Sequence, residues 1–264
     1  KPELTKWHGK TLPDEHRLNT ERKTGAAYKS PFTFKKYGQS GLPVSEMFPH
    51  VAKHADDLCV IRSMRADVPN HEPSLMLMNC GDGRLVRPSM GSWVTYGLGT
   101  ENQNLPGFVV LPRASYPQGG ASNWSNGFLP AEYQGTPLRP EGSPILDLNL
   151  PTGMTRGDQR GNLDLLAQLN KKHFQQRPQQ DELKARMSSY ELAYRMQMEV
   201  PGILDIDGET EKTREAYGIG EAKTDAFGRK CLLARRLVEK GVRFVQAHAI
   251  NSLITSPPNW DNCL

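Results

Sequence analysis

The sequence lacks the features that mark several classes of protein. No apolar run approaches the roughly 18 residues of a transmembrane helix, and no signal peptide is recognisable at the start. Basic residues occur in runs of no more than two or three, and the net charge is only +4, which argues against a nucleic-acid-binding surface. The four cysteines include no C-x-x-C pair. We therefore expect no membrane span and no nucleic-acid partner.

What is present suffices for a folded core. The 264 residues are 37% hydrophobic and 23% charged, and the mean hydropathy is −0.61. Apolar runs nevertheless recur along the chain, which is not typical of a disordered protein. A chain of this length forms one large α/β domain or two small ones. Cys59, Cys80 and Cys231 lie inside apolar runs, so we expect them to be small core residues.

Two short helices are predicted between Pro69 and Gly99. Pro73 suits the first position of one helix, and Gly81 suits the position after its end. Pro88 and Gly99 bracket the second helix in the same way. The apolar face of this second helix, which we expect to pack on the core, consists of Met90, Trp93, Val94 and the small Gly97.

Polar residues cluster at the start of the first helix. Asn70, His71 and Glu72 lie where unpaired backbone N–H groups and the positive end of a helix dipole collect. Such a helix start can bind an anion, which makes these three residues candidates for a hydrolytic site. Structural roles are the alternatives: His71 as a capping or loop histidine, and Glu72 as a favourable charge at a helix start. We interpret Ser74 as a first-turn residue rather than a nucleophile.

Three short apolar runs are predicted to be strands buried in a parallel sheet, namely Leu58–Ile61, Gly107–Pro112 and Val242–His248. A predicted helix at residues 225–240 leads directly into the last strand, which is typical of a doubly wound α/β fold. His248 falls at the carboxyl end of that strand. Ligands of such sheets bind beyond the carboxyl ends of the strands.

The remaining segments suggest how the chain is organised. Residues 1–43 are broken by prolines and are predicted to form an extended N-terminal arm, followed by an α/β domain over residues 44–264. Within that domain we predict a helix at Ser45–Ala55, a loop-rich insertion at residues 113–157 and a helical hairpin at residues 158–199. His50 and His54 have the spacing of metal ligands on one helix face, but we interpret both as surface or half-buried histidines.

Several motifs resemble stretches typical of one family of proteins, the domain-of-unknown-function 1501 family. They are Phe34 to Gly41, Asp67 to Glu72, Arg87 to Gly99, Leu105 to Phe108, Gly127 to Pro130, Ser189 to Gln197 and Cys231 to Gln246. The family is sulfatase-like and is grouped with the alkaline phosphatase superfamily. The resemblance implies an α/β fold with a mostly parallel central sheet flanked by helices, here truncated at both ends. It also favours an exported or periplasmic protein.

The resemblance further implies a metal-dependent hydrolase of phosphate or sulfate esters. Its substrate would be a small anionic ester or a sulfated or phosphorylated saccharide, and its cofactor a divalent metal such as zinc or calcium. Sulfatases carry their nucleophile in a C/S-x-P-S-R pattern, which His71-Glu72-Pro73-Ser74-Leu75 resembles here. His71 stands at the nucleophile position and Leu75 at the arginine position. A neutral histidine can ligate a metal or act as a nucleophile or acid–base group.

Two departures from the family pattern concern the metal site. The strand and the acid- and histidine-bearing loop that precede Lys1 in the family are not in this sequence. Near the other end, the family's Trp-Asp-His/Asn-His motif reads Trp260-Asp261-Asn262-Cys263. The candidate metal ligands that remain are His71, His248 and Asp261, and for His248 a structural role is an equal alternative. We therefore expect a metal site that is incomplete, or that binds no metal in this chain.

A second function class stays open beside the hydrolase. The chain could be a non-catalytic binding or structural relic of the same fold. Within that class, Trp124, Phe128 and Tyr133 are candidates for carbohydrate binding, provided that their rings form a flat, exposed surface.

Overall fold

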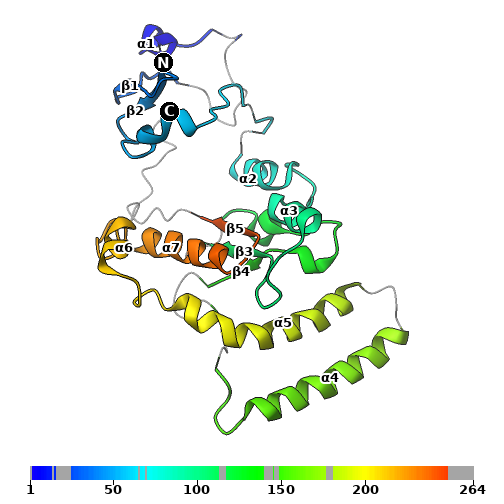
Figure 1. The fold of residues 1–264 in the computed structure, drawn as a ribbon. Coiled ribbons are helices and arrows are strands. Elements are labelled where there is room, and N and C mark those ends of the chain that lie inside the picture. The colour runs from blue at the N-terminus through cyan, green and yellow to red at the C-terminus, as the bar shows by residue number, and fades with distance from the viewer. Residues whose placement is uncertain are drawn as a thin grey trace. The chain divides into compact units, whose positions relative to one another are not determined.

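The structure, a computed structural model, describes residues 2–13, 15, 25–64, 66–68, 70–112, 117–139, 145, 149–176 and 181–248. These residues form two compact units, one extending to Ala66 and the other beginning at Asp67 (Figure 1). Each unit has its own elements and its own buried residues.

The first unit contains an antiparallel hairpin and short helices. Its elements are α1 (Pro2–Trp7), β1 (Phe34–Tyr37), β2 (Leu42–Ser45) and the 3₁₀ helix η2 (Val51–Asp57). β1 pairs with β2 so that Phe34 lies opposite Ser45. The carboxylate of Asp56 accepts hydrogen bonds from the backbone N–H groups of Ser40 and Gln39, each 2.9 Å long, and these bonds lower the pKa of Asp56. Asp56 therefore ties η2 to the turn of the hairpin.

The helix predicted at Ser45–Ala55 is wrong over its first half. Ser45 ends strand β2, and helical structure begins only at Val51 and is of the 3₁₀ type. Pro49 supplies a physical reason, since a proline disfavours the α conformation in the residue before it. The strand predicted at Leu58–Ile61 is also wrong, because these residues have no regular structure.

Exposure of that apolar run explains why it forms no strand in this unit. The side chains of Leu58, Val60 and Ile61 are 42%, 51% and 63% exposed, and Cys59, predicted to be a core residue, is exposed as well. A continuous apolar run favours a buried strand only where other layers cover both of its faces. Among the described residues of this unit, the buried hydrophobic side chains are those of Ala52 and Ala55. That is too little apolar surface to enclose a strand.

The second unit is built on a parallel three-stranded sheet, which confirms the predicted α/β class. Its strands are β3 (Phe108–Leu111), β4 (Thr136–Pro137) and β5 (Phe244–Ala247). They lie in the order β4-β3-β5, and both outer strands run parallel to β3. The strands predicted at Gly107–Pro112 and Val242–His248 are thereby confirmed. All four residues of the central strand β3 are buried, as expected for a continuous apolar run in a parallel sheet.

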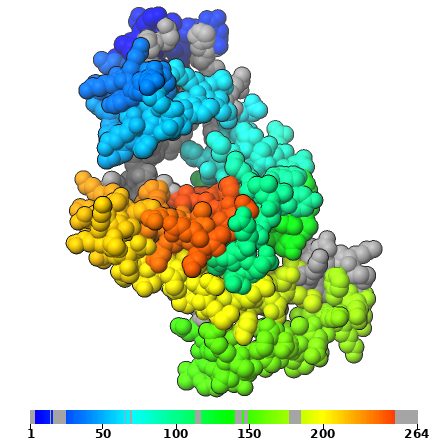
Figure 2. All heavy atoms as spheres, viewed as in Figure 1, coloured from blue at the N-terminus to red at the C-terminus, as the bar shows by residue number. Residues whose placement is uncertain are grey.

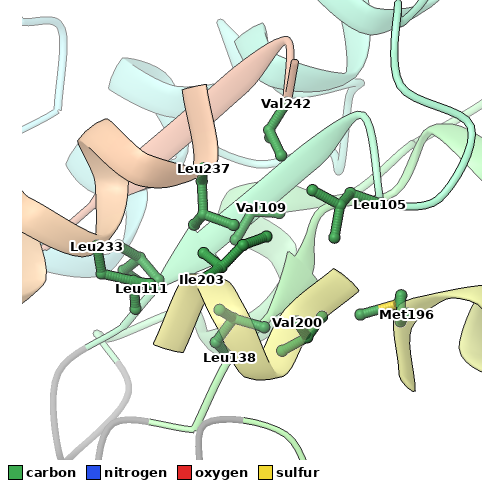
Figure 3. Close-up of a cluster of buried hydrophobic side chains, with 10 residues drawn as sticks. All are labelled: Leu105, Val109, Leu111, Leu138, Met196, Val200, Ile203, Leu233, Leu237 and Val242. Carbon is green, nitrogen blue, oxygen red and sulfur yellow. The ribbon is translucent and has the colours of Figure 1, made fainter. Parts of the chain in front are cut away.

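Side chains of β3 alternate between two hydrophobic clusters. Figure 3 shows Val109 and Leu111 among side chains of α5 (Asp181–Leu204) and α7 (Asp225–Glu239). Phe108 and Val110 belong to the second cluster, with the buried ring of Trp124. The period of two along a strand accounts for this division. The sheet is therefore covered on both faces.

Helix α3 (Met90–Leu98) packs through the face opposite to the one predicted. Met90 and Trp93 are 59% and 46% exposed, whereas Gly91, Ser92 and Thr95 are buried. A Cβ atom at Gly91 would lie 2.6 Å from the ring of Phe108, so only glycine permits this close approach. The predicted apolar face was wrong because proximity to the Phe108 ring selects small residues, a constraint that periodicity alone does not contain.

The second unit contains further helices besides α3, α5 and α7. They are α2 (His71–Cys80), the 3₁₀ helices η3 (Gly120–Trp124) and η4 (Ala131–Tyr133), α4 (Arg156–Gln176) and α6 (Glu211–Ala216). α4 packs against α5, on the side away from the sheet (Figures 1 and 2). The Arg160 guanidinium joins the two helices by donating two hydrogen bonds to the Glu191 carboxylate, of 2.9 and 2.7 Å, and by lying over the Tyr194 ring.

Candidate functional site

The predicted anion site lies at the start of helix α2. The helix begins at His71 and Asn70 is its N-cap residue, so Pro73 occupies the third helical position rather than the first. The Asn70 side chain makes no capping hydrogen bond. His71 and Glu72 are exposed. Asparagine is a common N-cap residue, but here the Asn70 side chain accepts no hydrogen bond from the N–H groups of the first turn.

Ser74 has a structural role in this turn. Its backbone N–H donates to the carbonyl oxygen of Asn70 (3.0 Å), which closes the first turn of α2. Its hydroxyl donates to the carbonyl oxygen of Val68 (2.9 Å). The interpretation of Ser74 as a first-turn residue is confirmed, because its hydroxyl is bonded to the preceding loop.

His248 lies at the carboxyl end of β5, as predicted, and its main chain is held from two sides. Its N–H donates to the carbonyl oxygen of Leu111 (3.0 Å), and its carbonyl oxygen accepts a hydrogen bond from the Lys230 ammonium (2.9 Å). The same ammonium donates to the carbonyl oxygen of Pro112 (2.7 Å). Lys230 is only 9% exposed. One buried cation thus joins the carboxyl ends of β3 and β5.

Sequence reasoning missed Lys230, although the sequence holds a signal for it. Lys230, Leu233 and Leu237 follow the i, i+3, i+7 spacing of one helix face, and all three are buried. A cation on the apolar face of a helix needs oxygen partners, because burial of an unpaired charge is costly. In this sheet the carbonyl groups at the strand ends supply them.

A chain of side-chain amides begins beside the His248 ring. The Gln246 Nε2 atom lies 3.2 Å from His248 Nε2 and donates to Asn79 Oδ1 at 3.0 Å. The rings of Trp124 and His248 pack edge to face, with centroids 6.1 Å apart. The imidazole is therefore positioned by a core tryptophan and by an amide from its own strand.

Asn79 and Asn123 extend this series of hydrogen bonds to backbone carbonyl groups. Asn79 Nδ2 donates to the carbonyl oxygen of Leu75 (2.8 Å) and to Asn123 Oδ1 (3.3 Å). Asn123 is fully buried, and its Nδ2 atom donates to the carbonyl oxygens of Gln118 (2.9 Å) and Gly120 (3.1 Å). We call Asn123, Asn79 and Gln246 the amide chain. Its members are far apart in the sequence, so no sequence motif predicts it.

The two candidate histidines lie at opposite ends of helix α2. Asn79, which bonds Gln246, is near the C-terminal end, and His71 lies about 12 Å earlier along the helix axis. No group of three or more His, Cys, Asp or Glu residues in the described part of the chain could hold a metal ion. Asp261 lies outside the described residues. A metal shared by His71, His248 and Asp261 thus stays a prediction.

The aromatic residues proposed for carbohydrate binding do not share one exposed surface. Trp124 is 1% exposed and belongs to the second hydrophobic cluster, whereas Phe128 is 65% exposed. Tyr133 meets the Tyr96 ring edge to face, with centroids 5.2 Å apart, and burial raises its pKa. The flat platform of Trp124, Phe128 and Tyr133 does not form, because the largest ring fills the core.

In the part of the chain that the structure describes, the helices are too short or too polar to span a membrane, in agreement with the sequence.

Comparison with known proteins places the chain in a family. Neither a curated protein nor a solved structure matches it. Residues 1–262, nearly the whole chain, match the family described as "Protein of unknown function (DUF1501)". The chain therefore belongs to the DUF1501 family, as its motifs at the start of α2 and along α3, α5 and α7 suggest.

Proposed function

We propose that this chain carries the central part of a site for phosphate or sulfate esters, with His71 as the reacting group. The observation that carries the proposal is the start of α2, where an exposed imidazole stands on the first residue of a helix whose N-cap residue, Asn70, makes no side-chain capping hydrogen bond. The resemblance to sulfatases supports it, since His71 stands where the sulfatase pattern has its nucleophile. The same resemblance supports an alkaline phosphatase-like sheet and an exported or periplasmic location.

The chemistry follows from the groups at this helix start. A non-bridging ester oxygen accepts hydrogen bonds from the first-turn N–H groups, and the helix dipole favours its negative charge. An unprotonated ring nitrogen of His71 then attacks the phosphorus or sulfur atom while the bond to the ester oxygen breaks, and the alcohol leaves after taking a proton from water. A second water later cleaves the bond to His71 and releases phosphate or sulfate. Alternatively, His71 removes a proton from a water that attacks the same atom, and the ester oxygen leaves in the same way. Asn70 and Glu72 are secondary candidates, the first as an amide donor to an ester oxygen and the second as a proton acceptor.

A divalent metal, zinc or calcium, enters the proposal through the family resemblance. The described residues do not fit it: they supply no group of three ligands, and the Nε2 atom of His248 faces the Gln246 amide nitrogen. We therefore assign no step of the reaction to a metal. His71, His248 and Asp261 remain the residues that a metal-binding experiment should address first.

An activity assay on the intact protein tests this proposal. Aryl phosphate and aryl sulfate esters are the substrates, and His71→Ala should lower kcat/KM by a factor of about 100 or more, the usual contribution of a positioned acid–base group. His50→Ala is the matched control, since His50 is an exposed histidine of the first unit. Full activity in His71→Ala would refute the role of His71, and absence of turnover by the natural protein would refute hydrolysis.

The second candidate function is non-catalytic binding of the same anions. It is favoured by the environment of His248, whose contacts with Gln246 and Trp124 suit a structural residue. Titration with inorganic phosphate and sulfate, followed by NMR, distinguishes the two. Shifts at the backbone N–H groups of His71 and Glu72 without ester turnover would favour binding alone.

A further inference from the structure

We infer that the amide chain acts as a set of positioning residues that holds His248 as a neutral imidazole with its proton on Nδ1. In this state the Nε2 lone pair accepts a hydrogen bond from Gln246 and is not open to a metal ion. For this ring the sequence left a metal-binding role and a structural role as equal alternatives. The inference does not depend on ester hydrolysis at His71.

The orientation of the amide groups is determined by Asn123, the member of the amide chain farthest from His248. Asn123 lies within hydrogen-bond distance of the carbonyl oxygens of Gln118 and Gly120. A carbonyl oxygen only accepts, so the NH₂ group of Asn123 must face these two atoms. Its Oδ1 atom must then face Asn79, which has to donate to it.

The orientation of Asn123 in turn determines that of Asn79, the next member of the amide chain. One hydrogen of its NH₂ group goes to Asn123 Oδ1, and the other goes to the carbonyl oxygen of Leu75, which again only accepts. The Oδ1 atom of Asn79 therefore faces Gln246 and accepts from its Nε2 atom. Three backbone carbonyl groups thus fix the orientation of two amides, and these fix the third.

The second hydrogen on Gln246 Nε2 is the one that reaches His248. An amide nitrogen cannot accept a hydrogen bond, so the 3.2 Å contact with His248 Nε2 is favourable only if that ring nitrogen is unprotonated. A neutral imidazole then carries its proton on Nδ1, because the hydrogen bond made by one ring nitrogen decides which nitrogen is protonated.

The alternative orientations are costly. Turning Gln246 alone would place its Oε1 atom against Asn79 Oδ1. Turning all three amides would set Oδ1 of Asn79 against Leu75 O and Oδ1 of Asn123 against the carbonyl oxygens of its own loop. Asn123 is fully buried, so these lost bonds could not be replaced by water. A histidine that ligates a metal offers the same lone pair that Gln246 occupies, so metal binding through Nε2 requires this contact to break.

The position of the imidazole is also restrained independently of the amide chain. Its backbone is held by Leu111 and Lys230, and its ring packs against the buried indole of Trp124. Breaking the amide chain should therefore change the protonation pattern of the ring before it changes the location of the ring.

Nitrogen NMR of the histidine rings tests the inference directly. Near pH 8, above the ordinary histidine pKa of about 6.5, ¹⁵N-labelled protein should show His248 with a protonated Nδ1 and an unprotonated Nε2. A proton on Nε2 in the natural protein would overturn the inference without any variant. Equimolar Zn²⁺ should leave both nitrogen signals of His248 unchanged, and a selective shift of Nε2 would also overturn it.

The variant Gln246→Glu sharpens the test, because it keeps the shape of the side chain but replaces the donor by an acceptor. The proton of His248 should then move to Nε2, or a second proton should bind there, and the Nε2 signal should shift accordingly. The matched control is Gln103→Glu, an exposed glutamine whose amide donates to the carbonyl oxygen of Thr100 in its own loop; it should leave His248 unchanged. Amide spectra establish that both variants fold. A folded Gln246→Glu protein that retains the Nδ1–H form would refute the inference.

Discussion

The two ends of helix α2 use their polar groups in opposite ways. At the N-terminal end, His71 and Glu72 are exposed and the Asn70 side chain makes no capping hydrogen bond. At the C-terminal end, Asn79 belongs to a chain of hydrogen bonds that includes a fully buried asparagine. Satisfied buried amides stabilise a fold, whereas unsatisfied exposed N–H groups are available to a ligand. One helix thus separates a structural end from an end suited to binding.

The largest expected effect lies at the structural end. Asn123→Leu removes the bonds to Gln118 and Gly120 and leaves those carbonyl oxygens without that donor. We expect a loss of about 3 kcal/mol in the free energy of unfolding, since each unsatisfied buried polar group costs about 1–3 kcal/mol. Urea unfolding followed by tryptophan fluorescence measures it, with buried Trp124 as a neighbouring reporter.

His71→Ala is the counterpart at the open end. His71 is exposed, so its removal should change the free energy of unfolding by no more than about 0.5 kcal/mol. Equal losses for His71→Ala and Asn123→Leu would remove the distinction between the two ends.

An effect between these two is expected where α2 ends. Gly81 has φ of 77°, and its backbone N–H donates to the carbonyl oxygen of Leu77. A side chain at Gly81 would meet no atom within 4 Å, so Gly81→Ala tests backbone strain alone. We expect it to destabilise the protein by about 1 kcal/mol. Gly97→Ala is the matched control, because Gly97 is also unobstructed and lies within helix α3. There alanine should be neutral or stabilising, since it favours helix.

A further effect concerns acid pH. Asp82 follows α2, and its carboxylate accepts hydrogen bonds from the backbone N–H groups of Leu85 and Arg84, which lower its pKa. A carboxyl group whose pKa is lower in the folded state stabilises that state above its unfolded pKa. This contribution should be lost as the pH falls below about 4, the ordinary pKa of an aspartate.

Thermal unfolding between pH 2 and pH 6 measures that contribution. Asp82→Asn should flatten the acid part of the profile. An unchanged acid part of the profile in Asp82→Asn would contradict the stabilising role of this carboxylate.

The sequence predicted the parts of the fold that depend on local patterns. Continuous apolar runs located β3 and β5, and Gly81 located the end of α2. The run at Leu58–Ile61 is apolar too, but the described residues of its unit supply no layers that cover it, so the pattern predicted a strand that does not form. Helix α3 was predicted with the wrong face inward, because the ring of Phe108 requires glycine at position 91.

The candidate site was predictable only in part. The positions of His71 and His248, at a helix start and just after a strand end, were predicted from local patterns, whereas their roles stay predictions. Lys230 and the amide chain were missed, since a polar residue inside an apolar pattern gives no indication of its partner. Asn79, Asn123 and Gln246 meet only through the packing of α2, η3 and β5. Such long-range polar contacts are determined by the tertiary structure.

The placement of α4 has a consequence for how the protein opens. No residue of α4 is buried, and Arg160 joins the helix to Glu191 and Tyr194 of α5. Elements with few buried contacts open at lower free energy than the core does. Backbone amides of α4 should therefore exchange with deuterated water through a local detachment of this helix, while those of β3 should exchange only when the whole unit unfolds. The second unit would then be a rigid body that carries one helix able to leave without disturbing the sheet.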